Sequence, residues 1–393
     1  MSGTGTARGR ARSRDARFMR RCLELAARAE GRSSPNPMVG AVVVRGGRVV
    51  AQAFHRYAGG PHAEALALRR VGAAARGATL YVNLEPCSHF GRTPPCADAI
   101  ARAGLRRVVA AHRDPYPRVR GRGFAALRRA GLDVDVGVLR GEAMRLNAKY
   151  LTFVSRRRPY VLVKVAMTVD GRIATAGGES RWISSPRSRR LAQRLRASYD
   201  AIMVGINTVL ADDPLLTARG GGRAARGGGR AARRRQPVRV VLDSRLRMGP
   251  EARLLRRGAG GPVIVYTTRL VPAARARRLE QRGARVVRLS ASRSGPRGRV
   301  DLRAALRDLA RRGITSVLIE GGGEVIGSAL EAGVVDRVAF FMAPLILGDR
   351  RAVASVGGRD AAVLREAIRL SRLSVRTIGP DLLLEATPGR RRR

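Results

Sequence analysis

The sequence has very little lysine and few acidic residues, although it is strongly charged. Its 393 residues include 78 basic and 29 acidic side chains, which gives a formal net charge of +49. Only two of the basic residues are lysine, Lys149 and Lys164. A surface that binds nucleic acid can use lysine as well as arginine as a point charge. The near absence of lysine therefore favours a compositional bias toward arginine, and we expect no nucleic-acid partner.

Long apolar runs and paired cysteines are missing as well. No uncharged apolar run reaches the length of about 18 residues that a bilayer span needs. The three cysteines, Cys22, Cys87 and Cys96, are too few for a disulfide framework. The segment 1–17 lacks the apolar stretch of a signal peptide. We therefore expect a cytoplasmic protein that does not associate with membranes, with Cys22 as a core residue of a helix.

The length predicts two domains. With 45% hydrophobic residues the chain can fill their cores. In the first half, strand-like and helix-like stretches alternate, which predicts a mixed sheet with helices on both faces. The strands are expected over 39–44, 48–53, 78–84, 107–111 and 133–136, and the helices over 18–30, 62–71, 95–103 and 123–130.

The second half reads as another α/β unit. Strands are expected over 160–166, 201–205, 238–243, 263–266, 286–289, 316–319 and 338–342, with helices over 186–197, 302–311 and 325–332. Two Gly/Arg-rich segments, 219–235 and 292–299, are expected to be disordered loops. The predicted domains are 16–155 and 159–387, with a disordered basic tail over 1–15 and a second basic tail over 388–393.

The strongest chemical signal is a set of metal-binding residue types at predicted helix starts. His62-Ala63-Glu64 is followed by Pro86-Cys87 and Pro95-Cys96. One imidazole and two thiolates can hold zinc tetrahedrally and leave the fourth position for water, whose pKa the metal lowers toward neutrality. Glu64 is placed to carry protons to the substrate and the leaving group.

This pattern is typical of zinc nucleobase deaminases, which combine H-x-E with P-C-x-x-C. Here eight residues instead of two separate Cys87 from Cys96. Two other interpretations stay open: three unrelated core or surface residues, or a purely structural zinc site, which normally has four protein ligands. His112 follows a strand and is expected to be structural or at the surface.

A second signal is Gly321-Gly322-Gly323, between a predicted strand that ends at Glu320 and a predicted helix. Glycines there let backbone amides approach a pyrophosphate at the positive end of the helix. The full G-x-G-x-x-G fingerprint is not met, and no acid about twenty residues on would bind a ribose hydroxyl. A glycine turn without a ligand is the alternative.

Several longer motifs closely resemble the deaminase half of the bifunctional riboflavin-biosynthesis deaminase/reductase family. They are Pro35-Asn36-Pro37-Met38-Val39-Gly40, the stretch from His55 to Glu64, and Glu85-Pro86-Cys87-Ser88-His89 continuing to Gly91-Arg92-Thr93-Pro94-Pro95-Cys96. The resemblance implies zinc ligands His62, Cys87 and Cys96 and Glu64 as proton shuttle. It also makes Asn36, His55, His89 and Arg92 candidates for substrate contact.

The second half resembles the reductase half of the same family, in the order and spacing of its motifs. These are Lys164 to Gly171, Gly178 to Ile183, Gly205 to Thr217, Asp243-Ser244 and Glu320-Gly321-Gly322. The resemblance implies NADPH contacts at Ala166, Trp182, Thr208, Asp212, Ser244, Gly322, Gly323, Glu324, Val325, Ile326, Gly327 and Ser328. It implies substrate contacts at Ser180, Arg196, Leu216, Arg219 and Glu320, and Lys164 and Glu320 become candidates for a charged pair at the hydride-transfer centre.

The resemblance thus implies a cytidine-deaminase-like three-layer α/β/α domain followed by a dihydrofolate-reductase-like α/β domain, with Zn²⁺ and NADPH as cofactors. The implied reactions are deamination of a phosphoribosylated diaminopyrimidine to the uracil, then reduction of the ribosyl group to ribityl. A homo-oligomer is expected. The alternatives are an RNA-binding nucleobase deaminase with an accessory α/β domain, which would use the arginine excess, and a zinc-stabilised scaffold without activity.

Overall fold

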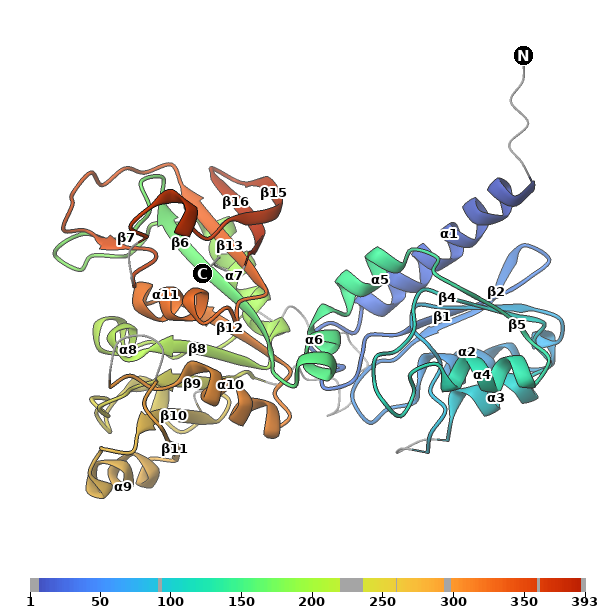
Figure 1. The fold of residues 1–393 in the computed structure, drawn as a ribbon, viewed down its shortest axis with the longest axis horizontal. Coiled ribbons are helices and arrows are strands. Elements are labelled where there is room, and N and C mark those ends of the chain that lie inside the picture. Colours follow the sequence, from blue (N-terminus) through green and yellow to red (C-terminus); the bar gives the residue numbers. More distant parts are fainter. Residues whose placement is uncertain are drawn as a thin grey trace, which may run out of the picture. The chain divides into compact units, whose positions relative to one another are not determined.

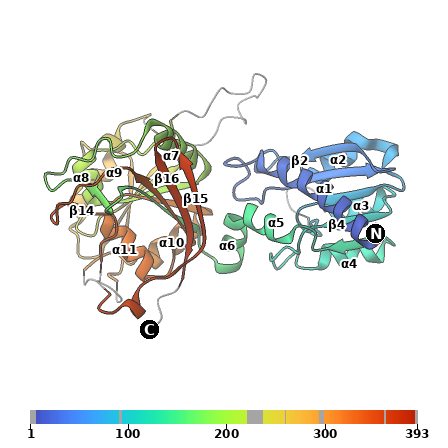
Figure 2. The ribbon, with the colours of Figure 1, turned by 90° about the horizontal axis from the view of Figure 1, so that it is seen from above.

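The computed structural model describes residues 7–90, 94–219, 236–258, 260–292, 298–358 and 361–389. These fold into two compact units, Met1–Arg157 and Arg158–Arg393 (Figures 1 and 2). Most of the two segments expected to be disordered loops lies outside the described residues, as does Arg92. No helix among the described residues is long and apolar enough to cross a membrane.

The first unit is built on a five-stranded sheet with the order β2-β1-β3-β4-β5. Strands β1 and β2 form an antiparallel hairpin, β1 is antiparallel to β3, and β3, β4 and β5 are parallel. Gly46 and Gly47 form the hairpin turn with φ of 56° and 77°, a conformation that favours glycine at both positions. The strands are β1 (Gly40–Arg45), β2 (Arg48–Phe54), β3 (Thr79–Val82), β4 (Arg107–Ala110) and β5 (Asp133–Val136).

Helices cover both faces of this sheet, as expected from the alternating pattern (Figure 1). Alternate strand residues point to opposite sides, so Val43 packs in one core and Val42 in the other. Helices α2 (Ala63–Val71), α3 (Cys96–Arg102) and α4 (Arg122–Arg129) cover the first side, and α1 (Ala7–Ala27) and α5 (Arg140–Leu146) the second. The unit ends with α6 (Ala148–Arg156), which the sequence pattern did not predict, as it did not predict α5.

The expected tail over 1–15 is helical from Ala7 onward, because α1 begins there rather than near Phe18. The side chain of Asp15 is buried and accepts hydrogen bonds from Tyr81 and Arg107. These contacts fix the early turns of the helix to the sheet, although the segment is rich in arginine. Cys22 is fully buried on the same helix, as predicted.

The second unit contains a nine-stranded sheet with the order β11-β10-β9-β8-β12-β6-β13-β16-β15. It is parallel up to β13, and β16 and β15 add an antiparallel edge. The strands are β6 (Tyr160–Thr168), β8 (Ala201–Gly205), β9 (Val238–Leu242), β10 (Val263–Thr268), β11 (Ala284–Leu289), β12 (Ser316–Glu320), β13 (Arg337–Ala343), β15 (Leu370–Ile378) and β16 (Asp381–Pro388). A separate pair joins β7 (Arg172–Ala174) to β14 (Val353–Ala354).

Helices again lie on both faces. Apolar side chains of α10 (Leu302–Arg311) and α11 (Gly323–Glu331) pack with one face of the sheet. Those of α7 (Pro186–Ser198), α8 (Ile206–Asp212) and α9 (Ala273–Gln281) pack with the other. Helices α8 and α9 and strands β7, β14, β15 and β16 were not predicted from the sequence. Figure 2 shows β15 and β16 side by side at the end of the sheet.

Candidate active sites

The three predicted metal ligands come from three segments at one end of the first unit's sheet. His62 directly precedes α2, Cys96 is the first residue of α3, and Cys87 lies in the loop after β3. Their ligand atoms lie within 4.8 Å of one another. The Nδ1 atom of His62 is 3.2 Å from Sγ of Cys96 and 3.5 Å from Sγ of Cys87. The structure therefore brings together the residues that the sequence singled out.

This donor set fits zinc. In a tetrahedral site with bonds of about 2.0 to 2.3 Å, neighbouring ligand atoms lie about 3.5 Å apart. A hydrogen bond between the two thiols lowers the pKa of Cys87 to about 4 and raises the pKa of Cys96. The backbone N–H of Cys96 also donates to Sγ of Cys87 at 3.3 Å. One imidazole and two sulfurs, with a thiolate stabilised by a helix start, are the chemistry that a zinc ion requires.

Glu64 lies in the first turn of α2 beside this cluster. Its side chain is 4% exposed, and burial raises the pKa of its carboxyl group. A carboxyl group whose proton is held more tightly than usual is suited to transfer protons near neutral pH.

Two of the expected substrate contacts join the same site. Nδ2 of Asn36 donates to Nε2 of His55 at 3.2 Å, and Nδ1 of His55 donates to the carbonyl oxygen of Pro61 at 3.0 Å. The His55 ring also meets the ring of His62 edge-on, with centroids 5.6 Å apart. The Nδ1 atom of His89 is buried without a hydrogen-bond partner among the described residues, so it is available to a ligand.

The sequence did not reveal that Glu85 stabilises the loop after β3, which carries Cys87. This buried carboxylate accepts backbone N–H groups from Asp114 at 3.1 Å and Gly121 at 3.0 Å. It also accepts those of Gly123 at 3.1 Å and Phe124 at 3.4 Å. Glu85 therefore fixes the segment before Cys87 to the start of α4, a role that its motif alone does not reveal.

Asp114 lies in the loop between β4 and α4, and the sequence pattern predicted no role for it. Its carboxylate accepts a hydrogen bond from the hydroxyl of Tyr150 at 3.0 Å, and burial raises its pKa to about 6. His112 is buried and its Nδ1 lies 2.8 Å from the carbonyl oxygen of Arg113. It therefore takes a structural position, as expected, and lies outside the metal cluster.

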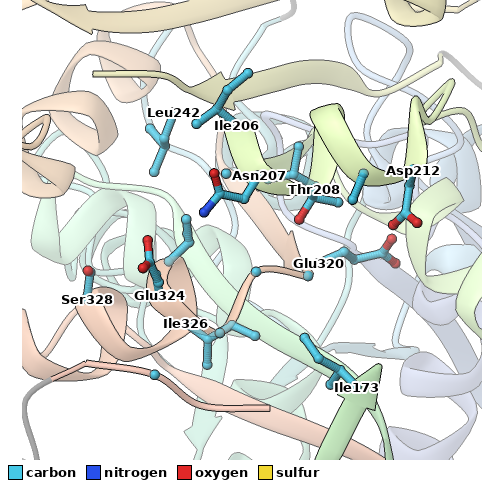
Figure 3. Close-up of a pocket in the computed structure, with 18 of the residues that line it drawn as sticks. Ile173, Ile206, Asn207, Thr208, Asp212, Leu242, Glu320, Glu324, Ile326 and Ser328 are labelled. Carbon is cyan, nitrogen blue, oxygen red and sulfur yellow. The ribbon is translucent and has the colours of Figure 1, made fainter. Parts of the chain in front are cut away.

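The second unit contains a cleft of about 1110 Å³ (Figure 3). Pockets for a single small ligand are typically about 300 to 1,000 Å³, so this cleft has room for a dinucleotide together with part of a second molecule. Most predicted cofactor residues line it: Ala166, Thr208, Asp212, Ser244, Gly322, Gly323, Glu324, Val325, Ile326 and Ser328. Of the predicted substrate contacts, Ser180, Arg196, Leu216 and Glu320 line it too.

Three predicted residues are not among those that line the cleft. Trp182 is 68% exposed and its ring packs against the guanidinium of Arg189 at 4.4 Å. Gly327 is buried where α11 meets a loop, because a Cβ there would lie 1.5 Å from the carbonyl oxygen of Gly357. Arg219 is exposed, and its backbone N–H donates to the side chain of Gln193.

A charged group lies at one end of the cleft. Glu320, at the end of β12, forms hydrogen bonds of 2.8 and 2.5 Å with Arg196 of α7. Arg196, followed by Lys164, lowers the pKa of Glu320 against the effect of burial. Burial also lowers the pKa of Lys164, so its ammonium group gives up a proton more readily than a surface lysine. The predicted Lys164 and Glu320 pair is thus part of a set of three in which Arg196 makes the direct contacts.

The glycine turn follows immediately. Gly321 and Gly322 have φ of 81° and 79°, which only glycine adopts readily. A Cβ at Gly322 would lie 3.3 Å from Oγ1 of Thr208 in α8. The backbone N–H groups of Val325 and Ile326 donate to the carbonyl oxygen of Gly322 at 3.0 and 3.1 Å, so α11 begins directly at the glycine turn. The positive end of its helix dipole there favours a negatively charged ligand group such as a phosphate.

Two family profiles match the chain. The profile described as the cytidine and deoxycytidylate deaminase zinc-binding region matches residues 12–112. The profile described as the RibD C-terminal domain matches residues 159–384. Each match covers one of the two sites described above.

Similar proteins align over nearly the whole chain. The riboflavin biosynthesis protein RibD of Aquifex aeolicus is 40% identical over 370 residues, which cover 94% of this chain and 97% of that protein. The protein of the same name from Escherichia coli is 39% identical over 373 residues, with 94% and 98% covered.

Solved structures agree. A structure of Acinetobacter baumannii RibD superimposes with a TM-score of 0.84 at 35% identity, covering 96% of this chain and 99% of that one. A structure from Thermotoga maritima gives a TM-score of 0.79 at 36% identity, covering 96% and 100%. The latter is described as a diaminohydroxyphosphoribosylaminopyrimidine deaminase/5-amino-6-(5-phosphoribosylamino)uracil reductase.

Proposed function

The chain belongs to the family of the riboflavin biosynthesis protein RibD, in which a zinc-dependent deaminase and an NADPH-dependent reductase share one chain; on that premise we propose the following substrates and residue roles. The first unit deaminates 2,5-diamino-6-hydroxy-4-(5-phosphoribosylamino)pyrimidine to 5-amino-6-(5-phosphoribosylamino)uracil. The second unit then reduces the ribosyl group to ribityl. The observation that carries the proposal is the convergence of His62, Cys87 and Cys96 beside the buried Glu64.

In the deaminase, zinc bound to these three side chains would lower the pKa of water so that a nucleophile is present at neutral pH. Glu64 would carry the two protons of the attacking water, one to the ring nitrogen and one to the amino group, which leaves as ammonia as the new carbon–oxygen bond replaces the carbon–nitrogen bond. Asn36 and His55 orient the pyrimidine, and His89 offers a free ring nitrogen to the substrate. Arg92, outside the described residues, would bind the phosphate of the substrate.

The substitution Glu64→Gln tests the proposed deaminase, because glutamine has nearly the size of glutamate but no carboxyl group that could carry a proton. We expect ammonia release to fall about 10²-fold to 10⁴-fold, while the zinc content and NADPH oxidation on the purified uracil intermediate persist. Unchanged deamination would refute the role of Glu64. Loss of zinc from the variant would show instead that the residue supports the metal site.

In the reductase, NADPH supplies hydride to the former C1′ of the sugar. The amides of the glycine turn bind its pyrophosphate, and Thr208 supports that turn. Lys164 and Glu320 face the reacting sugar as its charged neighbours, and Arg196 holds the carboxylate of Glu320 in place. The protein therefore acts mainly by positioning the two reactants.

Gly322→Val tests this cofactor site, because its side chain would enter the space in front of Thr208. We expect the KM for NADPH to rise while deamination is unchanged. Gly333→Val is the matched control, since Gly333 also has a positive φ of 61° but has no atom within 4 Å of an added Cβ. Equal effects of the two substitutions, or an effect confined to deamination, would overturn the assignment.

We propose a small phosphorylated pyrimidine rather than nucleic acid as the partner, and the cytoplasm as the compartment, since two thiol ligands must stay reduced. Salt-dependent, tight binding of tRNA together with no turnover of the free pyrimidine would contradict the first point.

We also propose a homo-oligomer that forms through the edge strand β15. Its face is exposed, with Leu373 at 57% and Val375 at 58%, and an open strand edge can pair with a second copy. Light scattering after gel filtration should show a dimer or larger species that Val375→Lys dissociates; a monomeric parent chain would contradict this.

A further inference from the structure

The ammonium group of Lys164 contacts an aromatic ring. Its Nζ atom lies over the ring of Phe341, 5.5 Å from the ring centre, which is within the range of a cation–π interaction. With the other described residues, this ammonium forms no hydrogen bond and no ion pair. In the mechanism proposed above, Lys164 lies beside the reacting sugar and Phe341 has no role. The ring is therefore the one direct contact of this charge that the reaction has not yet used.

The sheet places both side chains on the same face. Strands β6 and β13 are parallel, and Lys164 lies opposite Ala339. Two positions further on, Ala166 lies opposite Phe341. Because alternate residues of a strand share a face, Lys164 and Phe341 are diagonal neighbours, within reach of a long side chain and an aromatic ring. Phe341 is completely buried in an apolar core, so its ring has a fixed position from which it can direct the flexible lysine.

The surroundings of Lys164 do not favour its charge without this ring. Burial lowers the pKa of Lys164, Glu320 on β12 raises it, and Arg196 of α7 lowers it. Both contacts of Arg196 go to Oε2 of Glu320, and Oε1 has no hydrogen-bond partner among the described residues. The neighbouring positions of β13 are uncharged, Ala339 and Phe341. A partly buried ammonium next to a guanidinium needs further stabilisation, and the negative face of an aromatic ring provides it.

Reduction of the ribosyl group requires a proton as well as a hydride. The hydride adds at C1′, the bond from C1′ to the ring oxygen breaks, and that oxygen takes up one proton and becomes a hydroxyl group. An ammonium group beside the sugar favours this step, because it offers positive charge and a proton to the oxygen while negative charge develops there. The charged form of Lys164 is therefore the form that the reaction needs.

We propose that Phe341 is a positioning residue of the reductase: its ring holds the ammonium group of Lys164 charged and directed into the cleft, beside the sugar. This inference rests on the proposed reductase function. Lys164 lines the cleft, and Phe341 is not among the lining residues, so Phe341 acts through Lys164 and not by touching the substrate. A leucine at this position would fill most of the same space but would lack the negative ring face.

The scarcity of lysine allows a direct test by NMR. Lysine labelled with ¹³C at Cε gives two signals in the full, zinc-loaded chain, from Lys149 and Lys164, and Lys149→Arg assigns them. We expect the Cε protons of Lys164 to resonate upfield of those of Lys149, since this side chain ends over the face of a ring. Phe341→Leu should remove the upfield position and lower the pKa of Lys164 by about 0.5 to 1.5 pH units, because the charged form loses stabilisation. The pKa of Lys149 should stay the same.

The pH dependence of reduction should change in the same way. We expect turnover of the purified uracil intermediate to fall at alkaline pH as Lys164 loses its proton. In Phe341→Leu this fall should begin about 0.5 to 1.5 pH units lower, while the KM for NADPH and the rate of deamination stay unchanged. Phe341→Tyr keeps the ring and should retain both the upfield signal and the pH profile of the parent chain.

Phe340→Leu is the matched control. Phe340 precedes Phe341 in β13 and packs against the core on the opposite face of the sheet. The same substitution there removes a ring of equal size that does not face Lys164. It should change neither the signal and pKa of Lys164 nor the pH profile of reduction.

A Lys164 signal at the ordinary position in the parent chain would overturn the inference. So would a pKa of Lys164 that is the same in the parent chain and in Phe341→Leu, equal effects of the two leucine substitutions, or a pH profile that does not follow the pKa. The NMR signals do not depend on turnover. A chain that shows the ring contact but reduces nothing would therefore contradict the reductase function, whereas an active chain without the contact would contradict the role of Phe341 alone.

Discussion

Replacing Arg196 by methionine leaves the carboxylate of Glu320 buried without its closest cation. The two side chains are 18% and 7% exposed, and their shortest contact is 2.5 Å. Removing one partner of a buried pair costs about 3 to 5 kcal/mol, since the other charge stays buried. Lys164 also stabilises the charge of Glu320, though less than Arg196 does. We therefore expect a loss at the lower end, about 3 kcal/mol.

Urea unfolding followed by tryptophan fluorescence can measure this loss. The only tryptophan of the chain is Trp182, so the signal reports on the second unit. With a urea dependence of about 3 kcal/mol per molar, the midpoint should fall by about 1 M. The double variant with Glu320→Gln should recover most of this loss, because no carboxylate then stays buried without a cation. A midpoint for Arg196→Met equal to that of the parent chain would refute the reasoning, as would a double variant less stable than the single one.

Three other substitutions have defined outcomes. Cys96→Ser should abolish zinc retention, measured by elemental analysis of the purified chain, whereas Cys22→Ser should retain the metal. Burial raises the pKa of Asp114 to about 6 in the folded chain, against the ordinary 3.8, so the folded state holds this proton more tightly than the unfolded state does. The stabilisation that the proton provides is therefore lost as the pH rises through 6. In urea titrations, the free energy of unfolding of the parent chain should fall between about pH 4 and 6 relative to that of Asp114→Asn. Gly327→Ala places a Cβ against a backbone oxygen and should cost about 1 to 3 kcal/mol in the same assay, while Gly249→Ala, with open space around it, should not.

Much of the fold was accessible to sequence patterns because the buried strands alternate or are continuously apolar. Strand β8, which is buried at every position, and helix α10 have the bounds that the patterns predicted. The start of α1 was missed because its contacts are distant in sequence, as in the bond between Tyr81 and Asp15, 66 residues apart. Strand β15 was missed because it is exposed along most of its length and shows no buried face.

In the sites too, features with a local sequence pattern were predictable, whereas contacts between distant segments were not. The metal cluster was visible because His62, Cys87 and Cys96 are scarce residue types at helix starts. Trp182 was assigned to the cofactor by resemblance alone, and the structure places it outside the cleft lining. The role of Glu85 could not be predicted, since its partners are backbone amides, which every residue except proline carries.

Four backbone N–H groups donate to Glu85, and two of them belong to α4. Helix α4 contributes no metal ligand, yet through Glu85 it helps to fix the position of the metal centre. The amide groups of Gly123 and Phe124 belong to the first turn of α4, where a helix has N–H groups without partners of its own. Glu85 satisfies them from two positions before Cys87. The loop that carries Glu85 and Cys87 is therefore held to the start of α4, and the position of Cys87 at the metal centre depends on this helix.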